Sequence, residues 1–385
     1  MNYSGYRISN FILFLGIYFL LVILGVVDFF GMGSMLKFLA FLPIAFGFLG
    51  RHARLKGWGA VIVYYLFAIF SFIWSVNSEM SGDTAFAYCT FLLLVYTVSS
   101  QTYNEGEYNY LKACLRWSSI ISVVTAWSFA TFSEGRLIIR GGIMNEDPNY
   151  LCGYFYFGIA YCVEAFIKNN TKKSKLIYLA EILVYLFTIF CTGSRGGLLG
   201  GGAVAGIVFL RNNNKLSINA LFSKIVFVGI LLFTIPFVAS LVDPDVMERF
   251  SKEAISESDG SGRWDIWDDA IRAFKSSDFL HQMLGNGMGA SREVAQAFNF
   301  ARVNVMHNVF LENLIGVGII GTFLYLLNLL AFYKKSRCST FAMSVFVGMF
   351  VLSLSTSILY LKPSWNSMLF IVISSLATFN IDKTR

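Results

Sequence analysis

Charged residues are scarce in this chain, since they make up 14% of its 385 residues, whereas a soluble globular protein carries about 25%. Hydrophobic residues make up 56%, and apolar stretches recur from end to end. Many of them approach the ~20 residues that cross a bilayer. Long continuous runs favour helices over a membrane β-barrel, whose strands alternate over about 10 residues. The shortage of charge therefore excludes a soluble globular class, and we predict an all-α polytopic membrane protein.

Cysteine pairs are also lacking. The chain has six cysteines: Cys89, Cys114, Cys152, Cys162, Cys191 and Cys338. They form no CxxC pair, and none of them lies in the long outer segment described below. This argues against a disulfide framework or a zinc site, so we interpret them as small apolar packing residues. A small-residue cleavage site is missing after the first apolar run, 11–27, which we interpret as a retained helix rather than a signal peptide.

The apolar runs predict about twelve membrane-spanning helices. Their approximate ranges are 10–27, 34–50, 58–76, 84–100, 114–132, 149–167, 176–192, 196–210, 223–242, 307–333, 340–360 and 365–380. Basic clusters appear at every second connection, as at 51–56, 168–175, 211–215 and 334–337. Because Lys and Arg are retained on the cytoplasmic side, this alternation predicts that both termini are cytoplasmic. It also accounts for the net charge of +7 without a nucleic-acid partner.

One outer connection is long, and loops of that length are usually functional. We divide the chain into helices one to nine (1–242), an extracytoplasmic segment (243–306) and helices ten to twelve (307–385). Within the long segment, residues 263–275 predict an amphipathic helix with Trp264 and Trp267 on its apolar side. Tryptophans on such a helix suit a membrane interface.

Arg195 interrupts two apolar runs in the stretch TGSRGGLLGGG (192–202). The predicted topology places it at an outer turn, where an arginine costs less than at mid-bilayer. Glycines at i, i+4 spacing surround it, as in the pairs Gly193/Gly197, Gly196/Gly200, Gly197/Gly201 and Gly202/Gly206. Such spacing lets helices pack closely, and a glycine-lined helix start suits an anion. Two interpretations stay open: an arginine that reaches headgroups from a tight hairpin, or an anion-binding arginine.

Histidine is rare, with three in the chain. His52 lies in a basic cluster and His281 in the outer segment, whereas His307 opens the tenth span beside Asn308. A histidine there either caps the helix or accepts a proton from a sugar hydroxyl near pH 7. Arg263 projects into the apolar arc of the amphipathic helix, where it meets either lipid phosphate or a bound phosphate.

Five motifs resemble, in their order, the O-antigen ligase/polymerase family of membrane proteins. They are NEDPNYL (145–151), GSRGG (193–197), SGRWDIWDDAI (261–271), LGNGMG (284–289) and HNVFLENLIGVGIIG (307–321). The resemblance covers roughly residues 140–330. It implies a GT-C-like glycosyltransferase of the bacterial inner (plasma) membrane with its active site on the periplasmic, outer face. It also implies glycan donors on undecaprenyl pyrophosphate, with no metal, nucleotide sugar or other cofactor.

The resemblance assigns catalysis to Arg195, Arg263 and His307 of this sequence. Guanidinium groups fit phosphate oxygens and would stabilise a departing pyrophosphate, while His307 would position the acceptor hydroxyl or take its proton. Many relatives carry a glutamate where this chain has Gly316, and Glu312 lies one turn earlier. We expect substrate contacts from a further set, although a structural role stays open for each: Arg140, Asn145, Asn149, Trp267, Arg302 and Asn308.

The branch within this family stays open. A polymerase joins lipid-linked repeat units, whereas a ligase moves the finished chain to lipid A-core; we favour the polymerase because the chain is compact. A flippase would show an internal repeat and mid-membrane charges, which the sequence lacks. A metal-dependent enzyme that uses polyprenyl-phosphate sugars would want an early acidic pair, also lacking. Expected partners are an undecaprenyl-pyrophosphate-linked oligosaccharide donor and acceptor, the lipid bilayer, a chain-length regulator and a flippase, with no nucleic acid.

Overall fold

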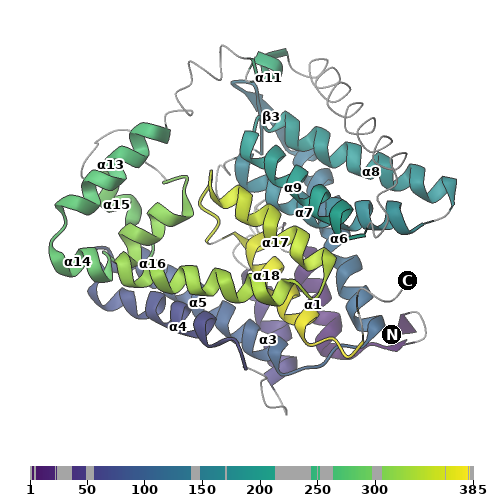
Figure 1. The fold of residues 1–385 in the computed structure, drawn as a ribbon, viewed down its shortest axis with the longest axis horizontal. Coiled ribbons are helices and arrows are strands. Elements are labelled where there is room, and N and C mark those ends of the chain that lie inside the picture. The colour runs from purple at the N-terminus through teal and green to yellow at the C-terminus, as the bar shows by residue number, and fades with distance from the viewer. Residues whose placement is uncertain are drawn as a thin grey trace.

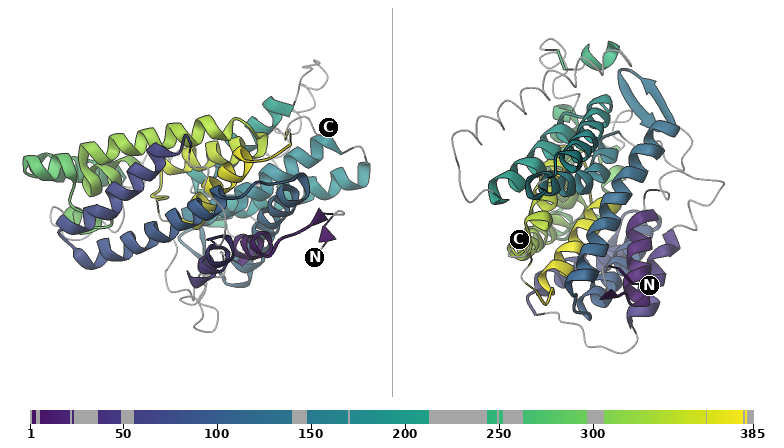
Figure 2. Two further views of the ribbon diagram at one scale, coloured as in Figure 1. Left: turned by 90° about the horizontal axis from the view of Figure 1, so that it is seen from below. Right: turned by 90° about the vertical axis from the view of Figure 1, so that its right-hand side faces the viewer.

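The computed structural model describes most of the chain as packed helices (Figures 1 and 2). The described residues are 2–3, 6–21, 23, 37–48, 56–139, 148–169, 171–212, 244–248, 250–251, 263–296, 306–359, 361–379 and 381. Helices dominate them, and the strands form two short hairpins. The predicted class, an all-α polytopic membrane protein, is confirmed.

The first half of the described chain supplies most of the bundle. Its helices are α1 (Asn10–Leu21), η3 (Lys37–Ala40), α3 (Phe41–Phe48), α4 (Gly59–Phe70), η4 (Ser71–Trp74), α5 (Ser78–Ser99), α6 (Glu105–Ser128), α7 (Pro148–Lys168), α8 (Lys172–Cys191) and α9 (Arg195–Asn212). The later helices are α11 (Pro244–Glu248), α13 (Arg263–Ser276), α14 (Phe279–Leu284), α15 (Ser291–Gln296), α16 (Val309–Ser336), α17 (Thr340–Ser353) and α18 (Lys362–Ser375). Each predicted span overlaps a helix except 223–242, which lies outside the described residues, so the total of about twelve stays a prediction.

Four of the described helices are long and apolar enough to cross a membrane. They are Ser78–Ser99, Pro148–Lys168, Lys172–Cys191 and Val309–Ser336, and shorter apolar helices lie at Asn10–Leu21, Phe38–Gly47, Gly59–Trp74 and Thr340–Ser353. In α7, 72% of the membrane-length stretch is buried, against 33–50% in the other three. Helix α7 is therefore the central helix, and α6, α8, α9 and α17 pack around it.

Basic residues from separate connections meet at one end of the bundle. The Arg211 guanidinium donates a hydrogen bond to the Arg337 carbonyl at 2.8 Å, and Lys335 Nζ lies 5.5 Å from the centre of the Trp58 ring. The marks N and C also lie on one side of the molecule in Figure 1. These contacts fit the predicted alternation, while the membrane side to which this end belongs stays a prediction.

The fifth predicted span, 114–132, extends too far. Helix α6 ends at Ser128, and the next residues form β3 (Ala130–Ser133), which pairs antiparallel with β4 (Arg136–Ile139). The turn between these strands holds Glu134 at φ 51° and Gly135 at φ 64°. Two consecutive left-handed residues match the right-handed twist of a hairpin, which explains why the chain turns here. Strands β1 (Asn2–Tyr3) and β2 (Tyr6–Arg7) form the other hairpin.

The tenth predicted span, 307–333, is not one straight helix. Gly318 has φ 66° and ψ −167° inside α16, which separates residues 309–317 from 319–336. In a straight helix the step from Phe310 to Tyr325 would span about 22 Å, yet their ring centroids lie 6.0 Å apart. Residues 309–317, which we call the folded-back segment, therefore return alongside the second half of α16. His307, which precedes this segment, therefore lies beside the second half of α16 and away from the end of the bundle at which Gly318 kinks the helix.

Candidate active site

Arg195 is the first residue of α9 and follows a tight turn out of α8. Gly193 adopts φ 64°, and its N–H donates to the Phe190 carbonyl at 2.9 Å, which ends α8. The Ser194 hydroxyl then accepts a hydrogen bond from the Gly197 N–H at 3.0 Å and starts α9. Half-buried Arg195 thus projects from a helix start, where unpaired N–H groups and the helix dipole favour an anion.

The glycines of α9 do not all serve helix packing. A Cβ atom on Gly197 would overlap Cys152 of α7, and one on Gly200 would overlap the Tyr156 hydroxyl. That hydroxyl donates to the Gly197 carbonyl at 2.9 Å, so α9 and α7 are in backbone-close contact. Gly202 and Gly206 instead have no neighbour for a Cβ atom within 4 Å among the described residues, so the predicted packing role finds no support for that pair there.

Two further segments meet the turn that carries Arg195. Arg136 of β4 donates from Nε to the Thr192 carbonyl at 3.0 Å. The Thr192 hydroxyl lies 3.4 Å from the Cys152 thiol, one turn after Asn149 in α7. Asn149 is buried, so the structure places this predicted substrate residue at the same end of the bundle as Arg195. The bond from Arg136 carried no signal in the sequence.

Arg263 is the first residue of α13, as the sequence predicts. Arg263 lies two turns before Ala270, so Arg263 and Ala270 share one face of α13. Ala270 on that face is buried against Met306 and Ile315. The Trp267 indole N–H donates to the Met306 carbonyl at 3.1 Å, which holds α13 beside His307. Trp264 is instead 60% exposed, so the predicted apolar side is divided between protein contact and the surface.

His307 has φ 49° and directly precedes the residue that caps α16. The Asn308 side-chain oxygen accepts hydrogen bonds from the N–H groups of Phe310 at 2.9 Å and Leu311 at 3.3 Å. Asn308 therefore supplies the cap, and this removes helix capping as the explanation for His307. Both side chains are half-buried.

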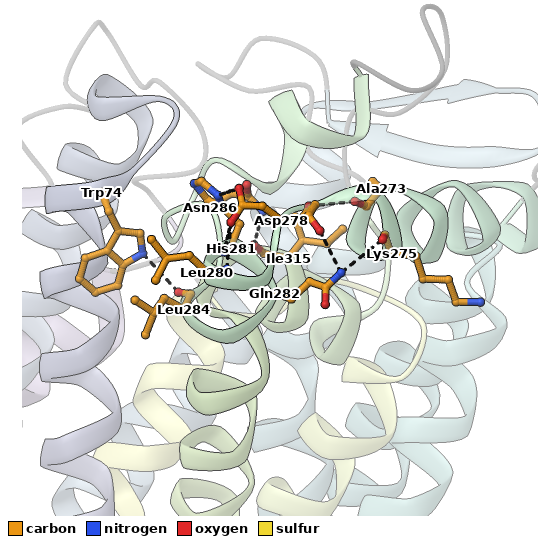
Figure 3. Close-up of polar contacts among 11 residues, drawn as sticks. Trp74, Ala273, Lys275, Asp278, Leu280, His281, Gln282, Leu284, Asn286 and Ile315 are labelled. Carbon is orange, nitrogen blue, oxygen red and sulfur yellow. Dashed lines mark hydrogen bonds and ion pairs between the residues drawn. The ribbon is translucent and has the colours of Figure 1, made fainter.

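The motif LGNGMG closes the kink in α16 (Figure 3). The N–H groups of Asn286 and Gly287 donate to the carbonyls of Ile315 and Gly316, both at 2.9 Å. The Trp74 indole also donates to the Leu284 carbonyl at 3.3 Å. The bonds to the Ile315 and Gly316 carbonyls occupy backbone groups that the kink at Gly318 releases from the helix, because buried carbonyls need partners. Two motifs that are separate in sequence therefore form one unit that orients the folded-back segment.

His281 lies in α14, next to this unit, where its ring contacts the residue that caps the helix. Asp278 caps α14 by accepting from the N–H groups of Leu280 and His281, and its carboxylate lies 2.5 Å from His281 Nδ1 (Figure 3). The hydrogen bond from His281 holds the pKa of the exposed Asp278 carboxyl below its usual range. His281 thus has a structural partner in Asp278.

Contacts through the connection between α17 and α18, residues 354–359, link the separate helix starts. A Cβ atom on Gly196, next to Arg195, would overlap the Ser355 hydroxyl. Two residues later, the Ser357 side chain lies beside the carboxyl of Glu312, one turn after Asn308. Gly196 of α9 and Glu312 of α16 therefore border the same connection, and Trp267 holds α13 against Met306, the residue before His307. In the sequence, the only sign of this connection is a short polar run, STS (355–357), between apolar stretches.

Three predicted substrate residues lie outside the described part of the chain: Arg140, Asn145 and Arg302. A pocket lined by Lys112, Glu164 and Lys168 lies at the other end of α7, about 22–28 Å along the helix from Asn149. Glu164 pairs with both lysines there. Among the described residues no three His, Cys, Asp or Glu side chains form a group that could hold a metal ion; metal independence remains a prediction.

Comparison with known proteins bears directly on these residues. Residues 181–326 match a family model described as O-Antigen ligase. The match begins within α8, ends within α16 and includes Arg195, Arg263 and His307. A search of curated proteins finds no match. The family supports a role in surface-polysaccharide biosynthesis of the ligase or polymerase type. This matched region, which holds all three predicted catalytic residues, supports the predicted resemblance to the O-antigen ligase/polymerase family of membrane proteins.

Proposed function

We propose that the protein is a surface-polysaccharide polymerase. It transfers a glycan from undecaprenyl pyrophosphate to a lipid-linked repeat-unit acceptor at the outer face of the plasma membrane, without a metal ion. The observation that supports this proposal is that all three predicted residues lie at helix starts: Arg195 begins α9, Arg263 begins α13, and His307 precedes α16. Two guanidinium groups at helix starts supply the positive potential that a pyrophosphate leaving group requires.

In the proposed reaction an acceptor hydroxyl oxygen attacks the anomeric carbon of the donor. The bond from that carbon to the pyrophosphate oxygen breaks, and its electron pair stays on the pyrophosphate. Arg195 and Arg263 stabilise this charge, which is larger in the transition state than in the bound donor. His307 takes the hydroxyl proton, a role that suits an imidazole near neutral pH.

The remaining residues would hold the sugars. Asn149 and Trp267 border the donor side, and the Asn308 amide, whose oxygen caps α16, keeps its nitrogen for the acceptor. Arg140, Asn145 and Arg302 remain proposed contacts on sequence grounds. A flippase that delivers lipid-linked units and a regulator that limits chain length are the partners this reaction calls for.

The test uses the purified protein in lipid nanodiscs. The substrate is the polyprenyl-pyrophosphate glycan extracted from cells that lack this protein, and products are measured with and without a chelator. We expect Arg195→Ala, Arg263→Ala and His307→Ala each to slow transfer by about 10²–10³-fold. Arg272→Ala is the matched control, because Arg272 pairs with Asp268 on the exposed face of α13, and surface pairs contribute little.

The outcomes separate the alternatives. Wild-type rates in all three variants would contradict the site, and loss of activity with chelator would contradict metal independence. Transfer that requires added lipid A-core would identify a ligase instead. In cells, deletion of a polymerase leaves single repeat units on the core, whereas deletion of a ligase leaves polymer on its lipid carrier.

A further inference from the structure

Glu312 has a buried carboxyl without a complete set of partners. The residue is 6% exposed, and within the described residues its Oε2 atom has no hydrogen-bond partner. No described Lys, Arg or His forms an ion pair with it. An unpartnered buried polar atom is costly, so the arrangement calls for a group that the protein itself does not supply.

The Ser357 hydroxyl is the hydrogen-bonding neighbour of this carboxyl, but no hydrogen bond of good geometry reaches Glu312 Oε2 or Ser357 Oγ within the described residues. Ser357 is 4% exposed, and its Oγ atom also lacks a partner in the described structure, as does the neighbouring Thr356 hydroxyl. Glu312 offers an acceptor, and Ser357 offers a donor. A sugar hydroxyl that donates to the carboxylate and accepts from the serine would satisfy both groups at once.

The position of Glu312 ties this pair to the transfer reaction. Glu312 lies one turn after Asn308 on the folded-back segment, and Asn308 stands beside His307 at its half-buried start. The next residue, Asn313, is fixed by its own bonds, since it accepts from the Tyr64 hydroxyl at 2.7 Å and donates to the Val309 carbonyl at 2.8 Å. The segment is thus held in one orientation, with Glu312 directed toward the connection 354–359.

We propose that Glu312 and Ser357 form a subsite that binds a second hydroxyl of the acceptor sugar while His307 handles the attacking one. This rests on the proposed transfer to a sugar acceptor. Both polar atoms are shielded from solvent in this structure, so the subsite opens when the irregular connection 354–359 shifts as the acceptor enters. Glu312 and Ser357 then select acceptors and leave donor binding to the arginines.

The experiment measures two quantities on the same nanodisc preparations. The first is the affinity for undecaprenyl pyrophosphate alone, which reports the donor side. The second is the transfer rate with the extracted lipid-linked glycan. We expect Glu312→Gln and Ser357→Ala to keep the wild-type affinity and to slow transfer by roughly tenfold or more, because the first loses the charge of the acceptor and the second loses the donor to the sugar hydroxyl.

The matched control is Asn328→Leu. Asn328 is also buried in α16, and both of its side-chain polar atoms lack partners in the described structure, but it lies well beyond the kink at Gly318. We expect wild-type values for both quantities. Ser357→Ala decides the matter if Glu312→Gln fails to fold, as judged by gel filtration and thermal unfolding.

The results distinguish two failures. If the wild-type protein neither binds undecaprenyl pyrophosphate nor transfers glycan, the proposed function is wrong. If the wild-type protein does both while the two variants transfer at wild-type rates, a trapped water or a proton satisfies Glu312 and the subsite is refuted. Loss of undecaprenyl pyrophosphate affinity in folded variants, or a slowed Asn328→Leu, would refute it as well.

Discussion

Two glycines of α9, Gly200 and Gly202, show how sharply surroundings change within half a helical turn. A Cβ atom on Gly200 would overlap the Tyr156 hydroxyl and lie 3.0 Å from the Gly348 carbonyl, whereas one on Gly202 would meet no described residue within 4 Å. We expect Gly200→Ala to destabilise the protein by about 1–3 kcal/mol through overpacking. Gly202→Ala should stabilise it by about 0.5–1 kcal/mol, because alanine loses less backbone freedom in a helix.

Thermal unfolding of the two variants in nanodiscs checks this prediction. Opposite shifts in midpoint are expected, with Gly200→Ala below the wild-type protein. A lowered midpoint for Gly202→Ala would mean that the described open space is filled in the membrane by another segment or by lipid that tolerates no methyl group.

At the same scale, single residues show what the sequence could predict. The cost of an arginine in apolar surroundings drew attention to Arg195 and Arg263, and the rarity of histidine to His307, while the family resemblance assigned their predicted roles. Glu312 and Ser357 were not assigned together. Glu312 and Ser357 come together because α16 kinks at Gly318 and because the connection 354–359 is irregular, and helical periodicity predicts neither feature.

At the element scale, the kink of α16 depends on two left-handed glycines that face each other. A Cβ atom on Gly318 would overlap the Met283 carbonyl, and one on Gly285 would overlap the backbone at Gly316. We expect Gly318→Ala to destabilise the protein by roughly 2–5 kcal/mol, since it combines backbone strain with overlap. The neighbouring Gly316→Ala, whose Cβ would lie 3.3 Å from Met288 Sδ, should cost clearly less. Thermal unfolding compares the pair, and equal losses would contradict the kink as described.

The docking of α13 supports a second prediction at this scale. Trp267 donates to the Met306 carbonyl, whereas its ring neighbour Trp264 is exposed. We expect Trp267→Phe to slow glycan transfer by roughly tenfold, because the lost hydrogen bond loosens α13 beside His307. Trp264→Phe keeps an aromatic ring without touching that bond and should transfer at the wild-type rate. Equal rates for the two variants would show that the Met306 contact does not orient the site.

Periodicity predicted the elements well where they are straight. Helix α13 begins at Arg263 and α9 at Arg195, close to their predicted starts. Periodicity did not predict the kink at Gly318, because a straight helix and a folded-back helix have the same continuous apolar sequence. It also failed after Ser128, where the short turn Glu134–Gly135 was not recognised as a hairpin.

For the whole molecule, the native cysteines offer a direct test of orientation. Cys338 is exposed next to Arg337 at the basic end, Cys89 is exposed on the apolar helix α5, and the other four are buried. In a Cys89→Ser background, we expect a membrane-impermeant maleimide to label Cys338 only from the cytoplasmic side. Lys275→Cys, on the exposed face of α13, should be labelled only from the outside. Labelling of both cysteines from one side would overturn the predicted topology.

The spacing between His307 and Gly318 acts as a ruler. The number of residues between these two left-handed positions sets the distance along the folded-back segment from the kink at Gly318 to the His307 imidazole. Adding a single residue inside this interval would rotate everything before it by about 100° relative to the kink and slide it by about 1.5 Å. Homologous proteins should therefore vary freely in length elsewhere along the predicted outer face, while the number of residues between these two positions stays constant.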